Sequence, residues 1–371
     1  MTTLRVDVRA DADVTPVSPA GTIGVLTFHD SINYGSYWQA RCLVEGLAAR
    51  GRPAVLLDHR SPAVRSAELR SAFQPELPAR TPRRHHPALG RKVRAFTDAV
   101  AALPRSPAFP LDRPDQAEPV DTVVVGSDEV WNFAHPWYSA RPLFFGEGLR
   151  ARRLVSYAAS FGNHPAAKGV DAGWTARLRR FDAVSVRDEN SRAMIAAALS
   201  IEPDMVLDPC LQFPAVLPAA PSSEGDYILL YGHGLPGWFV QAVRRWATAT
   251  GTRIVSVGYP NAVADEDRSD AGPLEFAALM AGARAVATSF FHGAVFALHY
   301  ARPFVAAASP YRRLKLEGLT DQLGARHRLI DETTGDAAIR QLLGTPLEPE
   351  VHRRIAEGRV RSTRYLDRVL A

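Results

Sequence analysis

ARAVATSFFHGAVFALHY, residues 283–300, is the stretch around which the rest of the chain is arranged. Its residues 285–288 form a short apolar run that predicts a buried strand, and residues 294–298 are apolar enough to predict a buried helix. His292 stands between them, at the carboxyl end of the strand and the amino end of the helix. Ligands of open α/β sheets bind at this edge, and the free N–H groups of a helix start attract anions. We therefore interpret His292 as a functional residue, and a packed histidine in a tight turn is the alternative.

Composition sets the class of protein. The chain has 371 residues, of which 46% are hydrophobic and 22% charged, so we expect a globular protein of two domains. The formal net charge of +5 suits anionic substrates such as phosphates, but without a nucleic-acid-binding motif it predicts no nucleic-acid partner. Cys42 and Cys210 lie in apolar surroundings, as reduced core thiols do. Residues 1–20 lack the apolar core of a signal peptide, so we expect a cytoplasmic protein. The composition leaves the oligomeric state open.

Strand-like apolar runs alternate with helical patterns in two series, which predicts an α/β protein with parallel sheets. A stretch rich in proline, alanine and serine separates the series and is typical of a linker. We expect the following organisation: a loose tail over 1–20, an N-terminal α/β domain over 21–213, a linker over 214–225, a C-terminal α/β domain over 226–345, and a C-terminal helix over 346–371 that packs back toward the first domain.

A basic run, residues 80–94, lies in the least regular region of the first series. A solvated insertion of helix and loop is the interpretation we favour for it. The alternative is a surface that binds anions or makes peripheral contact with a membrane.

Polar residues follow the apolar strands at six places. Because the carboxyl ends of parallel strands meet at one edge of a sheet, these loops should face a shared cleft. Carboxylates, a histidine at a helix start and several cations together suit transfer of a group from an anionic, phosphorylated donor to a hydroxyl. The sequence contains no nucleophile elbow, zinc-protease pair, Walker loop or dinucleotide-binding turn. The six places are residues 29–34, 127–132, 187, 233, 292 and 312–315.

Six segments, in order, also carry a family resemblance. They are FHDSINYGSYWQA at 28–40, VVVGSDEVWN at 123–132, SYAASFG at 156–162, AVSVRDENS at 183–191, VLDP at 206–209 and TSFFHGAVFALHYARPFV at 288–305. Over residues 21–324 the chain resembles the polysaccharide pyruvyl transferase family. The resemblance implies two Rossmann-like domains that face a cleft, as in the glycosyltransferase-B architecture. It also implies transfer of a pyruvyl group from phosphoenolpyruvate to hydroxyls of a sugar or glycoconjugate, with formation of a ketal.

Site residues follow from the same resemblance. The catalytic histidine of the family falls on His292, its arginine on Arg187, and a basic residue on Lys315, with Arg312 and Arg313 as competitors. We expect Asp30 or Asp128 to orient or deprotonate the acceptor, and helix capping is their alternative role. Phosphoenolpyruvate is a co-substrate, and neither a cofactor nor a metal is expected. The remaining residues expected to bind substrate are Asn33, Tyr34, Ser127, Ser289 and Gly293.

Two residues depart from the family pattern. Trp38 stands where an aliphatic residue is expected, and Glu129 stands where glutamine is common. Both residues are candidate indicators of specificity for a different acceptor. The alternatives to a pyruvyl transferase are a nucleotide-sugar glycosyltransferase of the same architecture, a family member with another donor or acceptor, and a non-catalytic sugar-binding homologue.

Overall fold

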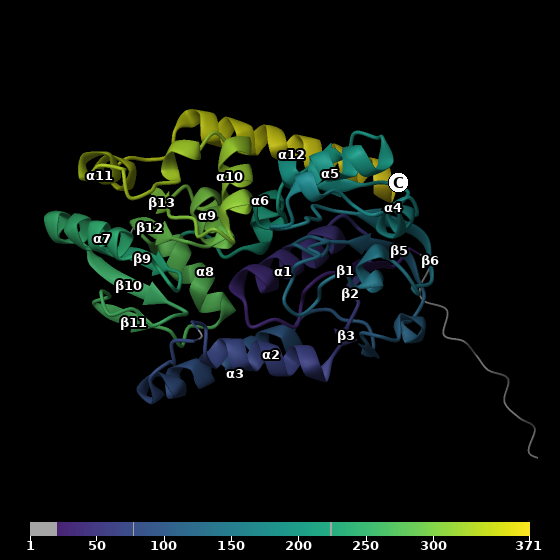
Figure 1. Ribbon diagram of the computed structural model, residues 1–371, viewed down its shortest axis with the longest axis horizontal. Coiled ribbons are helices and arrows are strands. Elements are labelled where there is room, and N and C mark those ends of the chain that lie inside the picture. The colour runs from purple at the N-terminus through teal and green to yellow at the C-terminus, as the bar shows by residue number, and fades with distance from the viewer. Residues whose placement is uncertain (1–20, 77, 223–224) are drawn as a thin grey trace, which may run out of the picture.

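Two parallel β-sheets, one in each half of the chain, form the centre of the computed structural model (Figure 1). The structure describes residues 21–76, 78–222 and 225–371, so the predicted tail and residues 223 and 224 of the predicted linker lie outside it. The first sheet has the strand order β2-β1-β5-β6, and the second has the order β11-β10-β9-β12-β13. The strands are β1 Ile23–Leu26, β2 Ala54–Leu56, β5 Val120–Val125, β6 Ala151–Ser156, β9 Tyr227–Tyr231, β10 Arg253–Val257, β11 Glu266–Arg268, β12 Ala285–Thr288 and β13 Phe304–Ala306.

The central strands of both sheets are apolar on both faces, as strands covered by helices on either side should be. Leu26 of β1 lies opposite Val125 of β5, and Thr288 of β12 lies opposite Tyr231 of β9. The loops that follow these strands therefore start at one edge of each sheet. That edge carries the polar residues on which the predicted site depends.

Helices surround the two sheets. Those of the first half are α1 Tyr34–Ala48, α2 Pro62–Phe73, α3 His86–Ala101, α4 Ala172–Leu178, α5 Glu189–Leu199 and α6 Pro209–Gln212. Those of the second half are α7 Gly237–Thr250, α8 Pro273–Gly282, α9 Phe291–His299, α10 Arg313–Gln322, α11 Asp336–Gly344 and α12 Pro349–Leu370. Two short strand pairs, β3 His59–Arg60 with β4 Phe109–Pro110 and β7 Ser185–Val186 with β8 Asp204–Met205, complete the first half.

Helix α1 begins earlier than the apolar pattern predicts. The sequence places its start at Trp38, whereas the structure begins it at Tyr34. Asn33 is its N-cap, and its side chain accepts a hydrogen bond of 3.2 Å from the Ser36 amide. The polar residues after β1 are therefore partly helical, and they enter the site on a rigid element.

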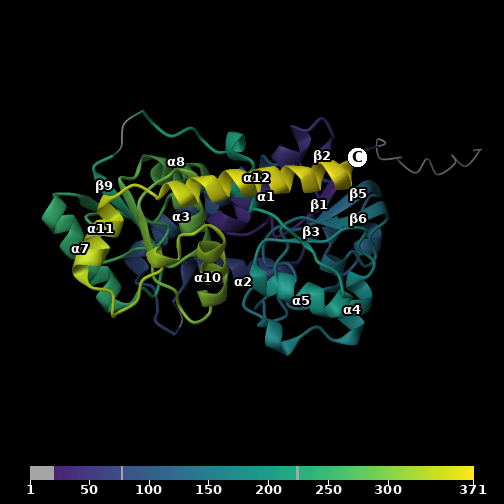
Figure 2. The ribbon, with the colours of Figure 1, turned by 90° about the horizontal axis from the view of Figure 1, so that it is seen from above.

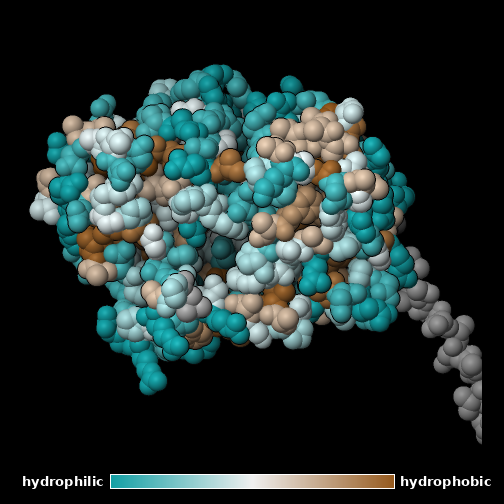
Figure 3. Space-filling view, viewed as in Figure 1, coloured by the Kyte–Doolittle hydropathy of each residue, from teal (hydrophilic) through white to brown (hydrophobic). Residues whose placement is uncertain are grey.

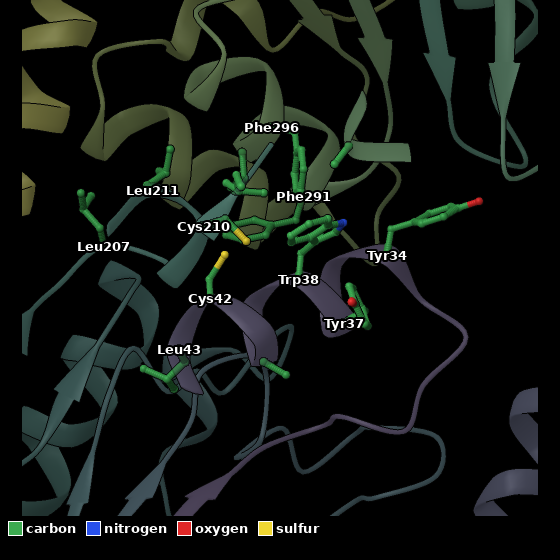
Figure 4. Close-up of a cluster of buried hydrophobic side chains, with 14 of the residues drawn as sticks. Tyr34, Tyr37, Trp38, Cys42, Leu43, Leu207, Cys210, Leu211, Phe291 and Phe296 are labelled. Atoms are coloured by element: carbon green, nitrogen blue, oxygen red, sulfur yellow. The ribbon is translucent and has the colours of Figure 1, made fainter. Parts of the chain in front are cut away.

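A buried apolar core joins the two halves, and Figure 4 shows part of it. Trp38 of α1 packs against Phe296 of α9, and its indole Nε1–H donates to the carbonyl of Pro273 at 2.9 Å. Cys42 and Cys210 are free and buried, and in Figure 4 their sulfur atoms point toward each other. Because α1 belongs to the first half and α9 to the second, this core fixes the halves against each other.

Helix α12 runs from the second half back across the first (Figure 2). The hydroxyl of Tyr365 donates to the carbonyl of Ser156 in β6 at 2.6 Å. The Oγ of Ser362 accepts from the amide of Leu207 at 2.9 Å. The last helix thus hydrogen-bonds to residues of the first half over its C-terminal part.

Helix α3 contains much of the basic run of residues 80–94. Most of the run is at least partly exposed, but Lys92 is buried. In the described part of the chain, no helix combines the length and the apolar character that a membrane crossing needs. Figure 3 shows hydrophilic and hydrophobic residues interspersed over the face seen in Figure 1.

Candidate active site

A hollow of about 330 Å³ lies between the two halves. Its wall includes Asp128 and Arg187 from the first half and His292, Arg312 and Lys315 from the second. These residues follow strands of different sheets, and the fold brings their side chains to one space.

His292 is the second residue of α9 and lies in the wall of the hollow. Its Nε2 lies 3.5 Å from Oδ2 of Asp208, which is an ion-pair distance, and makes no hydrogen bond within the described residues. The other side of the ring lies against Gly35 of α1, where an added Cβ atom would overlap the imidazole. The ring thus lies between the carboxylate of Asp208 and the backbone of α1, and its buried Nε2 has no hydrogen-bond partner among the described residues.

Arg187 follows β7 and lies in the wall of the hollow, with a side chain only 3% exposed. It donates to Asp208 at 2.8 Å and to Asp128 at 3.1 Å. Its guanidinium also lies 4.5 Å from the ring centroid of Phe291. The guanidinium group that the sequence predicts to bind a substrate anion is therefore already bound to two carboxylates.

Asp128 lies in a tight turn after β5. Gly126 has a φ of +114°, and a Cβ atom there would overlap the carbonyl of Tyr157, so the turn requires glycine. Asp128 accepts a hydrogen bond of 2.9 Å from the hydroxyl of Ser36 in α1. Burial would raise the pKa of Asp128, but the neighbouring positive charges, above all Arg187, hold it well below its ordinary value. This carboxylate is ionised at neutral pH.

Lys315 of α10 forms an ion pair with Glu129, with 2.8 Å between Nζ and Oε1. Burial would raise the pKa of Glu129, but the charge of Lys315 lowers it. Glu129 is one of the two departures from the family pattern, and it contacts Lys315, which the sequence predicts to bind substrate. A glutamine at this position would leave Lys315 without its carboxylate.

The other predicted site residues divide into three groups. Asn33 and Arg312 lie in the wall of the hollow. Tyr34, Ser127 and Ser289 are buried, and Gly293 packs so closely on Thr288 that a Cβ atom would overlap its side chain. Asp30 and Arg313 lie elsewhere: Asp30 pairs with Arg60 and Arg65 and lines a separate hollow, while Arg313 is exposed and lies 3.7 Å from Glu317.

Comparison with known proteins decides the family. The sequence pattern of the polysaccharide pyruvyl transferase family matches residues 33–309. The chain belongs to the polysaccharide pyruvyl transferase family. No curated protein sequence matches it at a significant level.

Several solved structures are similar to this member of the pyruvyl transferase family. A UDP-GlcNAc 2-epimerase from Methanocaldococcus jannaschii has a TM-score of 0.50 at 13% identity, with 93% of this chain and 99% of that chain covered. The same enzyme from Neisseria meningitidis, bound to UDP-GlcNAc, has a TM-score of 0.49 at 13% identity, with 94% and 99% covered. A glycosyltransferase involved in avilamycin A biosynthesis has a TM-score of 0.46 at 14% identity, with 94% and 96% covered. The expected architecture is confirmed: the chain is an α/β protein of the glycosyltransferase-B type with two Rossmann-like domains.

Asp208 and Lys92 are site residues that the sequence does not single out. Asp208 belongs to the VLDP segment that supports membership of the pyruvyl transferase family, and its place after a short strand is the signal that could have found it. Lys92 lies in the basic run, where most neighbours face solvent. Glu68 of α2 also lines the hollow and comes from a region without a clear pattern.

Three buried groups near His292 have the chemistry of metal ligands. One ligand atom each of Asp208, Cys210 and His292 lies within 4.8 Å of the others. Asp208 is also bound to Arg187, whose positive charge opposes a cation at this place. The absence of a metal from the reaction of this protein stays a prediction.

Proposed function

We propose that the chain transfers a pyruvyl group from phosphoenolpyruvate to hydroxyls of a sugar or glycoconjugate and forms a cyclic ketal. One observation carries this proposal: His292 lies in the wall of a hollow with an imidazole nitrogen free of hydrogen bonds to the described residues, beside ionised carboxylates and cations. Membership of the polysaccharide pyruvyl transferase family supports it. The proposed reaction takes place in the cytoplasm.

In the proposed reaction His292 donates a proton to the methylene carbon of phosphoenolpyruvate. The adjacent carbon gains positive character, and an acceptor hydroxyl attacks it. The C–O bond to phosphate breaks, and the phosphate leaves with the hydroxyl proton. A second hydroxyl then closes the ketal and returns a proton to His292. General acid catalysis of this kind contributes about a hundred- to ten-thousand-fold in rate.

The carboxylates around His292 have two roles in this scheme. Asp208, at 3.5 Å, stabilises the imidazolium electrostatically. Asp128 is ionised and lies in the wall, so it orients the acceptor hydroxyl by accepting its hydrogen bond. Arg187 joins the two carboxylates and keeps both in place. Asp30, which lines another hollow, has no part in the scheme.

A nucleotide-sugar glycosyltransferase is the second candidate function. The aromatic side chains of Tyr231, Tyr259 and Phe290 in the wall favour it, because a nucleobase or a sugar ring stacks on such groups. A non-catalytic homologue is less well supported, since the family's histidine and arginine are both present.

Ligand-induced stabilisation separates these functions. Phosphoenolpyruvate should raise the unfolding temperature of the protein, because a ligand that binds only the folded state stabilises it. UDP-sugars should not raise the unfolding temperature.

Turnover is a second measurement. With a panel of sugars, phosphoenolpyruvate should release inorganic phosphate and give a product heavier by one pyruvyl ketal. Turnover should persist in EDTA. Stabilisation by UDP-sugars alone would instead support the glycosyltransferase.

A further inference from the structure

The end of the hollow around Arg187 has no surplus positive charge. Arg187 is bound by Asp128 and Asp208, and Lys315 is bound by Glu129 at 2.8 Å. Three carboxylates thus face two cations. Phosphoenolpyruvate carries a phosphate and a carboxylate, so this end attracts it only weakly unless His292 is protonated.

The same hollow is also lined by two cations of a different kind. Lys92 of α3 is 1% exposed, and its Nζ donates to the carbonyl of Gly258 at 2.9 Å. The same Nζ lies 4.3 Å from the ring centroid of Tyr259. Arg312 lies 4.3 Å from the ring centroid of Phe290 and hydrogen-bonds to Ser309 and His233. Within the described residues, neither cation has a carboxylate at ion-pair distance.

Burial without a counter-charge is costly for both groups. It lowers the pKa of Lys92 to about 7 and lowers the pKa of Arg312. Glu68 faces Lys92, but burial raises the pKa of that carboxyl to about 7, so the negative charge of Glu68 and the positive charge of Lys92 are both incomplete at neutral pH. A bound anion would supply the charge that these cations lack.

His233 shows that the two cations face one small space. Its ring centroid lies 5.0 Å from that of Tyr259 and 5.3 Å from that of Phe290, the rings beneath Lys92 and Arg312. Burial and the charges of Arg312 and Lys92 lower the pKa of His233 to about 4, so it is neutral and its Nε2 accepts from Arg312. Both cations line the hollow that contains His292.

We propose that Lys92 and Arg312 form a phosphate-binding part of the hollow, which holds the phosphate dianion of a substrate while His292, in the wall of the same hollow, acts as the acid. The inference rests on the proposed function and deepens it. Two cations from different halves of the chain suit a dianion better than a carboxylate. The phosphate belongs either to phosphoenolpyruvate or to a phosphorylated acceptor. Arg187 is then a positioning residue for Asp128 and Asp208.

Calorimetric titration with inorganic phosphate tests the site without turnover. Lys92→Met keeps the length of the side chain and Arg312→Gln keeps a donor, and each should weaken phosphate binding by roughly tenfold or more, because a charged hydrogen bond is lost. Arg313→Gln, which removes an exposed charge one residue away, should leave the affinity unchanged. Equal affinity in all four proteins would overturn the proposal. If Lys92→Met does not fold, Arg312→Gln decides alone.

Two further titrations identify the source of the phosphate. Weaker binding of phosphoenolpyruvate to both variants assigns the site to the donor. Weaker binding of a hexose 1-phosphate, with unchanged binding of phosphoenolpyruvate, assigns it to the acceptor. Unchanged binding of both overturns the proposal. The two proposals can fail separately. If phosphate binds through Lys92 and Arg312 but the protein does not consume phosphoenolpyruvate, the phosphate site is supported and the proposed function is refuted.

Discussion

His292 owes its position to a residue without a side chain. Gly35 lies inside α1, and the backbone there approaches the imidazole so closely that a Cβ atom would overlap the ring. The sequence predicts a functional histidine at 292, but this contact joins residues far apart in the chain and has no local signal. The same holds for Arg187: its motif indicates an important arginine, while its two carboxylate partners become neighbours only in the folded chain.

Gly35→Ala should displace His292. Replacing glycine by alanine inside a helix ordinarily stabilises a protein by about 0.5–1 kcal/mol, so a loss here would come from the overlap. We expect turnover with phosphoenolpyruvate to fall by at least about tenfold, which corresponds to about 1.4 kcal/mol in the barrier. Gly237→Ala, at the start of α7 where a Cβ atom meets nothing, is the matched control. Equal turnover in the Gly35→Ala variant and the wild type would show that the overlap is relieved without moving the ring.

Apolar strands are the most predictable elements. The predicted strand at 285–288 has the bounds of β12, and the apolar runs at 120–125 and 227–231 coincide with β5 and β9. Elements whose stability comes from their neighbours are harder to predict. β11, with the charged residues Glu266–Arg268, exists because β10 pairs with it. α2 has a capping serine at 61 and a proline at its first position, but these signals lie in a proline-rich region where they do not stand out.

Glu68 of α2 should make stability depend on pH. Burial raises the pKa of its carboxyl from 4.5 to about 7, so the folded state binds more protons than the unfolded state between these values. The stability that Glu68 contributes is therefore lost as the pH rises from 4.5 to about 7. Glu68→Gln removes this loss, so its stability relative to wild type should increase by up to about 3 kcal/mol from about pH 5 to about pH 8.

Chemical denaturation at several pH values measures this difference. Glu118→Gln replaces an exposed carboxyl and serves as the control. Its stability relative to wild type should stay flat over the same range. A flat difference for Glu68→Gln as well would mean that Glu68 is not buried as the structure has it.

The glycosyltransferase-B architecture is predictable because βα alternation and six family segments point to it together. The core between the halves is not predictable. Trp38 is a candidate mark of a changed acceptor by its sequence position, whereas its side chain packs in that core and bonds to Pro273. The hollow depends on this core, since its walls come from both halves. An apolar side chain carries no sequence signal for which of two domains it will contact.

Transfer from phosphoenolpyruvate by wild type and His292→Gln is the most direct measurement of the proposed chemistry. Glutamine retains a hydrogen-bonding group but cannot supply the proton, so phosphate release with an active sugar acceptor should fall by about a hundredfold or more. Binding of phosphoenolpyruvate should change little, because proton transfer belongs to the transition state. Near-normal phosphate release and ketal formation by His292→Gln would contradict the assignment of His292 as the acid.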